Sequence, residues 1–350
     1  MNKWLIAVGL VAGLMACRPS AAGKARLACE PGGKIFEEGF VPIGGIEQWV
    51  TIHGVNCTNP VVLVVHGGPG NPSTPFAENL YGAWEKDFTL VQWDQRGSGK
   101  TLAHNPATAA QRLTMASMAR DGTEVAAYVI HRLGERPVIL FGGSWGSALG
   151  INMLRLKPEL FSAYLGTSQM VEYRANQAAT YQRLLELTRA AGDEAAVSSL
   201  ESLGMPPWKN PRAFGIVRRI TRRYEAKTTQ PAPETWWKFL PGYDTEAYKA
   251  AYTAGEDYSY IQFVGLKGDG MLARIDLPGL GMTFRVPIFI IQGEEDLLTM
   301  PAVTKAYFDR ITAPTKKYIL LQKVGHDPNP LMVEAQFEVL TTQIAPLLHR

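Results

Sequence analysis

A serine between glycines is the residue of this chain best suited to nucleophilic chemistry. Ser144 lies in the run Gly-Gly-Ser-Trp-Gly of residues 142–146, which follows the apolar run 137–141 and precedes a helix-compatible run, 147–156. A serine on a tight turn between a strand and a helix adopts a strained backbone conformation, and glycines two positions away leave room for it. Its hydroxyl then projects above the end of the sheet. We therefore predict that Ser144 attacks a carbonyl carbon.

A base for this serine is expected later in the chain. The apolar run 318–322 predicts a buried strand, and His326 follows it after a short turn. His349 also lies in this part of the chain, but it is the penultimate residue, at the end of an expected terminal helix. A histidine beside a serine accepts the hydroxyl proton as the serine attacks. We predict that His326 is this base.

An acidic residue must in turn orient the histidine. Asp296 follows the buried-strand pattern of residues 286–292 and precedes Pro301, which is expected to begin the next helix. Glu294 and Glu295 are rivals in the same turn, and we choose Asp296 because it completes the turn. Serine, acid and histidine then follow one another in the chain order typical of the α/β-hydrolase fold.

The elements around these residues agree with that fold. Further strand patterns occur at residues 46–52, 60–65 and 88–93, and apolar residues recur at helical spacing over 118–133. Strands that alternate with helices form a parallel sheet with right-handed crossovers. We expect an α/β-hydrolase with a mostly parallel central sheet and helices on both faces.

Two glycine-rich loops follow strands ahead of Ser144. They are His-Gly-Gly-Pro-Gly at residues 66–70 and Asp-Gln-Arg-Gly-Ser-Gly at residues 94–99. An attacked carbonyl develops negative charge on its oxygen, and backbone N–H groups fixed in advance stabilise it. We predict an oxyanion hole formed by the N–H groups of Trp145, directly after the serine, and Gly68 in the first loop.

Together, residues 66–70, 94–99 and 142–147 resemble the motifs of the proline iminopeptidase (prolyl aminopeptidase) family of serine peptidases. The likeness covers residues ~35 to 170 and ~284 to 348. It implies an enzyme that releases an N-terminal residue, often proline, from short peptides and needs neither a metal nor another cofactor. The expected partner is therefore a small peptide or acyl substrate.

The expected domain is divided by an insertion. The core comprises residues 35–170 and 284–350, and residues 171–283 are mostly helical and precede the strand that leads to the acid. An insertion at this place is a cap, and caps close over the site and determine specificity. Its aromatic residues, such as Trp208 and Trp236, either form the cap's own core or line a substrate pocket.

The cap also lacks one feature that the resemblance implies. In the aminopeptidases, cap carboxylates bind the free ammonium of the substrate, and a Trp-x-x-Trp-Glu segment contributes to that site, but no such segment occurs here. Asn71 stands where the family usually has glycine. The substrate-binding residues therefore stay undetermined. The acidic candidates that the sequence offers for an amine are Glu234, Glu246, Glu256 and Asp257.

Three functions remain open on these grounds. The first is an exported aminopeptidase of the proline iminopeptidase type. The second is an exported esterase, amidase or other α/β-hydrolase with the same triad and a different cap specificity. The third is a surface-binding lipoprotein on an inactivated hydrolase scaffold, which the intact triad disfavours.

The N-terminus predicts export. Residues 1–17 have an early lysine, an uncharged apolar run and a small residue before Cys17, which is the pattern of a signal peptide. The apolar run of about 13 residues is shorter than the ~20 that cross a bilayer. Its end resembles a bacterial lipobox, which would attach the chain to a membrane through a lipidated Cys17. Plain secretion is the alternative, and residues 18–34 are expected to be a tether. Either way we expect an exported bacterial protein, periplasmic or membrane-anchored.

Two cysteines remain if Cys17 is an anchor. Cys29 and Cys57 could form a disulfide, because export favours oxidation. Two free buried thiols are the alternative.

Composition excludes some classes of partner. The chain is 46% hydrophobic and 19% charged, as in an ordinary soluble enzyme, and its net charge of +3 argues against nucleic acid. Nothing in the sequence indicates an oligomeric state. At helical spacing, four arginines form two neighbouring rows, which predict either a solvated helix face or an anion-binding or membrane-facing patch. They are Arg218, Arg219, Arg222 and Arg223.

Overall fold

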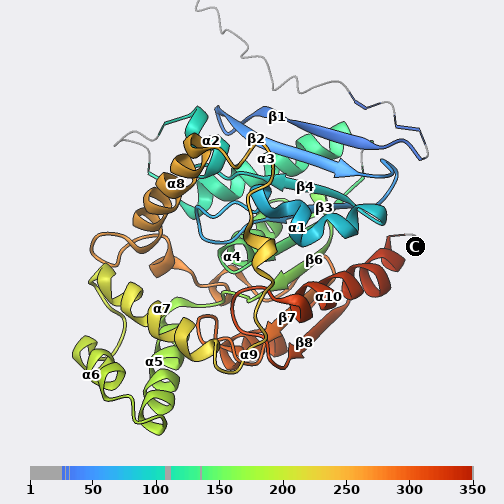
Figure 1. Ribbon diagram of the computed structural model, residues 1–350. Helices are drawn as coiled ribbons and strands as arrows, with labels where there is room; N and C mark the ends of the chain where they lie inside the picture. The colour runs from blue at the N-terminus through green and yellow to red at the C-terminus, as the bar shows by residue number, and fades with distance from the viewer. Residues whose placement is uncertain (1–25, 28, 31, 107–111, 135, 349–350) are drawn as a thin grey trace, which may run out of the picture.

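The computed structural model describes residues 26–348 except 28, 31, 107–111 and 135. The predicted signal peptide, Cys17 and His349 lie outside the described residues. One sheet of eight strands forms the centre of the molecule (Figure 1). The strands are β1 (Ile35–Ile43), β2 (Ile46–Gly54), β3 (Val61–Val65), β4 (Thr89–Trp93), β5 (Val138–Gly143), β6 (Phe161–Thr167), β7 (Ile288–Gly293) and β8 (Lys316–Leu321).

The strand order is β1-β2-β4-β3-β5-β6-β7-β8. β1 pairs antiparallel with β2, and β2 pairs antiparallel with β4. Every other neighbouring pair is parallel. This mostly parallel sheet confirms the predicted fold class. The sequence patterns did not reveal β1 and β6.

Helices cover both faces of the sheet. Successive residues of a strand point to opposite faces, so they pack against different helical layers. In β3, Leu63 packs with Met118 and Leu149 on one face, whereas Val62 packs with Leu80 and Met332 on the other. All five side chains of β3 are buried because a parallel sheet between two helical layers leaves neither face in water. The helices of the first layer are α3 (Met115–Arg132), α4 (Trp145–Leu156) and α9 (Pro301–Arg310), and those of the second are α1 (Ala77–Tyr81) and α10 (Pro330–Val339).

The cap lies between β6 and β7. It contains α5 (Tyr173–Ala190), α6 (Glu194–Leu203), α7 (Pro211–Glu225) and α8 (Glu246–Val264). The first three project from the lower left of the sheet in Figure 1 and share a hydrophobic core that includes Leu184, Leu200 and Trp208. α8 lies beside α2 (Gly99–His104), where the Ser259 hydroxyl donates to the Gly97 carbonyl at 2.9 Å, and it also contacts α7, because the Tyr260 hydroxyl donates to the Pro211 carbonyl at 3.1 Å.

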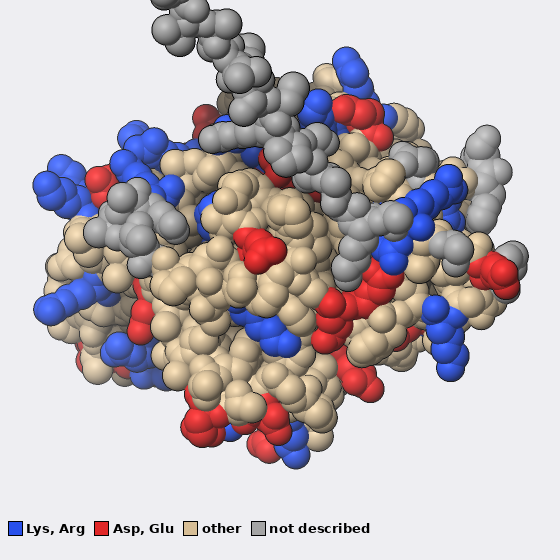
Figure 2. Space-filling model, turned by 90° about the horizontal axis from the view of Figure 1, so that it is seen from above, with Lys and Arg blue, Asp and Glu red and all other residues tan. Residues whose placement is uncertain are grey.

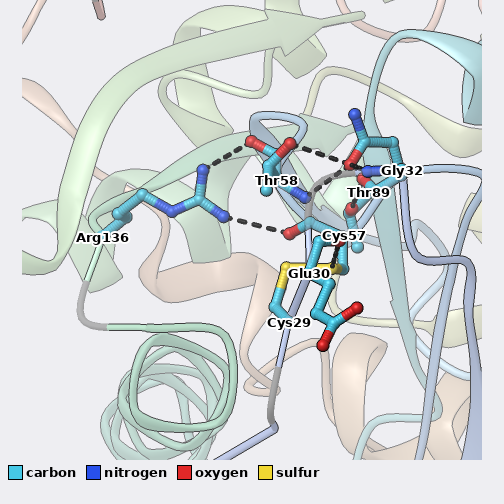
Figure 3. Close-up of a disulfide and its surroundings, with 8 residues drawn as sticks. Cys29, Glu30, Gly32, Cys57, Thr58, Thr89 and Arg136 are labelled. Carbon is cyan, nitrogen blue, oxygen red and sulfur yellow. Dashed lines mark hydrogen bonds between the residues drawn. A yellow bond between two sulfur atoms is a disulfide. The ribbon is translucent and has the colours of Figure 1, made fainter.

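A disulfide joins Cys29 to Cys57, with a Cα–Cα distance of 5.9 Å (Figure 3). It links the segment before β1 to the turn between β2 and β3. Arg136, which lies near the start of β5, donates to the carbonyl of Cys57 at 3.2 Å. Of the two alternatives for these cysteines, the structure shows the disulfide.

The segment just before β1 is bound to the domain as well. The N–H of Leu27 donates to the carbonyl of Arg132, the last residue of α3, at 2.9 Å. Leu27 and Cys29 also pack against the hydrophobic core. Leu27 and Cys29, which lie within the tether predicted over residues 18–34, are thus in contact with the domain.

The surface of the described residues carries both positive and negative charges. Basic and acidic side chains are interspersed over the face that Figure 2 shows. None of the helices in the part of the chain that the structure describes is long and apolar enough to span a membrane.

Candidate active site

The backbone at Ser144 is strained, as the sequence predicts. Ser144 has φ 52° and ψ −121°, a left-handed conformation that is costly for a residue with a side chain. Its N–H donates to the Thr167 carbonyl of β6 at 3.0 Å. A side chain at Gly142 would overlap the Gly146 carbonyl, and one at Gly146 would overlap the Val65 carbonyl. The two glycines thus allow the turn that exposes the serine hydroxyl.

The structure brings His326 to this hydroxyl. His326 follows β8, and its Nε2 lies 2.8 Å from Oγ of Ser144. On the other side of the ring, Nδ1 lies 3.2 Å from each carboxylate oxygen of Asp296. Ser168 holds the backbone here by donating its hydroxyl to the His326 carbonyl at 2.8 Å. Residues from the ends of β5, β7 and β8 therefore meet in one hydrogen-bonded chain.

Asp296 is fully buried and its oxygens are bound on all sides. They accept the N–H groups of Leu298 at 2.9 Å and Thr299 at 2.7 Å, and the side-chain amide of Gln292 at 2.8 Å. Burial opposes its negative charge, yet the imidazole of His326 and the hydroxyl and N–H of Thr299 hold the pKa of Asp296 below its ordinary value.

The two rivals of Asp296 point elsewhere. Glu294 is exposed, and Glu295 accepts the N–H of Val324 at 3.1 Å. Of the three acidic residues in this turn, Asp296 is the one whose carboxylate is hydrogen-bonded to His326.

The environment of His326 favours its charged form. Burial lowers the pKa of this imidazole, but the carboxylates of Asp296, Asp327 and Glu225 outweigh burial, so the pKa of His326 lies above 6.5. A base with a raised pKa accepts a proton from a hydroxyl more readily, provided that it starts out neutral.

The predicted oxyanion donors lie beside Ser144. Trp145 is the first residue of α4, so its N–H has no carbonyl to bind within the helix. Gly68 and Ser144 line the same two cavities. A Cβ at Gly67 would lie 3.5 Å from the Ser144 Cβ, which places the 66–70 loop directly over the serine.

Gln95 joins the glycine loops, a role that the sequence did not suggest. Its side-chain amide donates to the His66 carbonyl at 2.9 Å and accepts the indole N–H of Trp145 at 3.0 Å. Its backbone N–H donates to the His66 ring at 3.2 Å. Gln95 is fully buried, so this one side chain fixes three loops relative to one another. Its place in the 94–99 motif was the available signal.

Glu225 is a second residue that the sequence did not reveal. It is the last residue of α7, and its two oxygens accept the N–H groups of Leu297 at 2.7 Å and His326 at 3.3 Å. A cap helix thereby holds the loops that bear the acid and the base. Burial, followed by the charge of Asp296, raises the pKa of Glu225 to about 7.

Two cavities meet at Ser144. The larger has a volume of about 780 Å³, and His326, Glu225 and the cap residue Trp237 contribute to its wall. The smaller, of about 50 Å³, lies under the cap and is mainly apolar. Its apolar wall is formed by Met170, Val171, Tyr173, Trp208, Phe214, Val217, Phe263, Leu272, Ile275 and Leu298.

The cap aromatics contribute both to the cap core and to the walls of the cavities. Trp208 belongs to the cap core and also lines the smaller cavity, and Trp237 lines the larger one. Within the described residues, no group of three or more His, Cys, Asp or Glu side chains is placed to hold a metal ion.

The four acidic candidates for amine binding do not line either cavity. Glu234, Glu246 and Asp257 are exposed. Glu256 is half-buried and accepts the side-chain amide of Asn71, which does line the larger cavity.

Residues 60–330 match the profile of the family described as alpha/beta hydrolase fold. The chain belongs to the α/β-hydrolase family. Among curated relatives, it is 26% identical over 293 residues to a probable aminopeptidase, YbaC, of Bacillus subtilis (strain 168), which covers 82% of this chain and 89% of that one. It is 24% identical over 302 residues to a proline iminopeptidase of Lactobacillus delbrueckii subsp. lactis, which covers 83% and 92%.

Solved structures agree on the fold of this α/β-hydrolase. The proline iminopeptidase of Mycobacterium smegmatis superposes with a TM-score of 0.60 at 19% identity, covering 89% of this chain and 98% of that one. The chain is thus a distant homologue of proline iminopeptidases, which confirms the resemblance seen in its motifs.

Proposed function

We propose that this α/β-hydrolase is a serine hydrolase that releases N-terminal residues from short peptides. The observation that supports it most is the 2.8 Å contact between His326 Nε2 and Ser144 Oγ at a strained serine. Homology to proline iminopeptidases and a probable aminopeptidase points to peptides as substrates.

In the proposed reaction, His326 accepts the Ser144 proton while Oγ attacks the substrate carbonyl. Asp296 holds the imidazole and stabilises its positive charge. The N–H groups of Trp145 and Gly68 bind the oxyanion, and one such donor lowers the barrier by about 3 kcal/mol. His326 then gives the proton to the leaving amine, and an acyl-enzyme on Ser144 remains. Water, activated by the same imidazole, releases the acyl group and restores the serine.

The cavities suit an acyl group with an apolar side chain. The smaller cavity lies at Ser144 and is lined by Phe214, Phe263 and other apolar residues, which would exclude water from that side chain. The larger cavity leaves room for the rest of a short peptide.

One observation favours the second candidate, an esterase or amidase that ignores the amine. Glu225 is a cap carboxylate bound to the loops of the acid and the base, but each of its oxygens already accepts a backbone N–H group. An ammonium ion would have to compete with these bonds or bind at Glu256, which is half-buried beside the larger cavity.

Free and N-acetylated aminoacyl amides of the same residue separate the two candidates. The aminopeptidase hydrolyses the free amine form, leaves the blocked form intact, and loses activity in the Ser144→Ala variant. Equal turnover of both forms would replace the aminopeptidase by the amidase. If the Ser144→Ala variant still hydrolysed both forms at the wild-type rate, the triad itself would be overturned.

Export through a signal peptide that is cleaved directly before Cys17 belongs to the same proposal. Intact mass of the protein from a bacterial membrane fraction would be that of a chain that begins at Cys17 and has acyl groups attached. In Cys17→Ala the added lipid mass would disappear. A soluble mature chain without acyl groups would instead indicate plain secretion.

A further inference from the structure

Arg218 lies on the side of α7 that faces the active site. It lines the smaller cavity and the larger one, and Ser144 lines both of them as well. Arg222 and Glu225, four and seven residues later, are on the same side of the helix and line the larger cavity. A cap helix thus presents a guanidinium to the space above the serine.

The two rows of arginines predicted from the sequence therefore differ. Arg219 is exposed, and Arg223 forms an ion pair with Asp193 within the cap. Their row is the solvated face of α7. Arg218 is half-buried and belongs to the row that faces the cavities, so the helix has one ordinary surface row and one row at the site.

The charged groups around Arg218 have partners of their own. Arg222 lies 3.8 Å from Asp327, Glu225 accepts two backbone N–H groups, and Glu256 accepts the amide of Asn71. No hydrogen bond or ion pair joins Arg218 to any residue that the structure describes. Burial, followed by the charge of Arg222, lowers the pKa of Arg218, although Asp327, Glu225 and Tyr260 partly oppose this shift.

Glu172, the acidic side chain in the wall of the smaller cavity, is also occupied. Its two oxygens accept the N–H groups of Arg174 and Ala175, both at 3.0 Å, at the start of α5. The wall of that cavity thus contains a cation with no acceptor among the described residues and a carboxylate each of whose oxygens already accepts one backbone N–H.

A guanidinium in this state has a clear chemical preference. It offers five N–H donors in a planar fork that matches a carboxylate, and it stays charged at any ordinary pH. Partial burial weakens competition from water, so a bound anion gains more than it would on an open surface.

We propose that Arg218 binds a carboxylate of the substrate, with Arg222 as the outer charge of the same subsite. The proposal rests on hydrolysis at Ser144 and adds the substrate class, namely peptides with a carboxylate close to the bond that is cut. Two sources fit this chemistry. One is the free C-terminus of a dipeptide in the larger cavity, and the other is an acidic side chain of the released residue.

Two matched substrate pairs test the subsite and distinguish the sources. The first is a dipeptide and its C-terminal amide, and the second is the aminoacyl amide of glutamate and that of glutamine. Wild-type protein is expected to prefer the charged member of one pair. Arg218→Gln is expected to lower kcat/KM for that member about 10- to 100-fold, the usual loss for a charge-assisted bond, and to change the neutral member less than about threefold.

Arg219→Gln is the matched control, because it removes the same charge one position away on the solvated row. It should leave both members unchanged. An equal loss for charged and neutral members in Arg218→Gln, or no preference in the wild type, would overturn the subsite.

Binding to the Ser144→Ala variant gives an independent reading by calorimetry. This protein keeps Arg218, and it is expected to bind the charged member at least about tenfold more tightly than the neutral one. Tight binding without any turnover by the wild type would leave the subsite standing and remove the proposed hydrolysis. Turnover by the wild type without this difference in affinity would leave the proposed hydrolysis standing and remove the subsite.

Discussion

At the edge of the sheet, Ser144 and Asp296 are held by contacts with residues close by in the chain or on the next strand, such as the N–H of Thr299. In the cap, α5, α6 and α7 share a core of side chains such as Leu184, Leu200 and Val217, each from a different helix. Short-range bonds thus fix the backbone at Ser144 and Asp296, and the sheet brings their side chains to His326, whereas the surface above them depends on how the cap helices pack. Reaction type and specificity are therefore separable in this molecule.

The two regions meet at a few points. Glu225 of the cap binds the backbones of both loops that bear the acid and the base, and Leu297 of the acid loop packs into the cap core. Changes at these points should alter chemistry and specificity together. Changes within the catalytic loops alone should alter the chemistry, and changes within the cap alone should alter specificity.

The largest expected effect comes from a change in the catalytic loops at the carboxyl ends of the strands. Asp296→Asn should lower kcat by about 10,000-fold, because the amide no longer holds the imidazole in its reactive tautomer. Glu295→Gln is the matched control and should keep most of the activity, since its carboxylate contacts the Val324 N–H instead. Steady-state kinetics on one aminoacyl amide measure both. A severe loss in Glu295→Gln alone would reverse the assignment.

The disulfide should affect stability and leave the site unchanged. Cys29 and Cys57 are separated by 28 positions. Removing a disulfide that closes a loop of this size lowers the free energy of unfolding by roughly 3 kcal/mol. The double variant Cys29→Ala and Cys57→Ala should therefore unfold at a lower denaturant concentration with unchanged kcat/KM. A change in kcat/KM under conditions in which the variant stays folded would show that the N-terminal segment reaches the site.

The contact between the regions should give an intermediate effect. Glu225→Gln keeps the shape but removes the charge that helps to raise the pKa of His326. We expect about a tenfold lower kcat, from weaker bonds to the two loops, and a pH profile shifted to lower pH. Glu234→Gln, an exposed cap carboxylate, is the control. An unshifted profile would mean that Glu225 acts on the fold alone.

The smallest change concerns pH in the unaltered protein. His326 must be neutral to accept the serine proton, and its pKa lies above 6.5. Activity should therefore be low where the imidazole is protonated and rise with pH through that raised pKa. A rate that is constant from pH 5 to pH 8 would exclude His326 as the base.

Much of the sheet edge could be predicted because its signals are local. Glycines around Ser144, apolar runs before Asp296 and His326, and chain order sufficed for the fold and for three residues that the structure brings together. Strand β6 (Phe161–Thr167) was missed because an apolar run directly after a helix has no distinctive period.

The cap could not be predicted in the same way. Glu225 matters through bonds to Leu297 and His326, which lie 72 and 101 positions away. The orientation of Arg218 depends on which side of α7 packs toward the cavities. Helical spacing separates two rows of arginines, but it does not say which row faces water.

Mass spectrometry after reaction with a fluorophosphonate tests the role of Ser144 most directly. One adduct is expected, on the peptide that contains Ser144, and it should be absent from Ser144→Ala and much slower to form in His326→Ala. Ser147→Ala, three positions on in α4, should still be labelled. Labelling of another residue, or none in the folded wild-type protein, would contradict a nucleophile at Ser144.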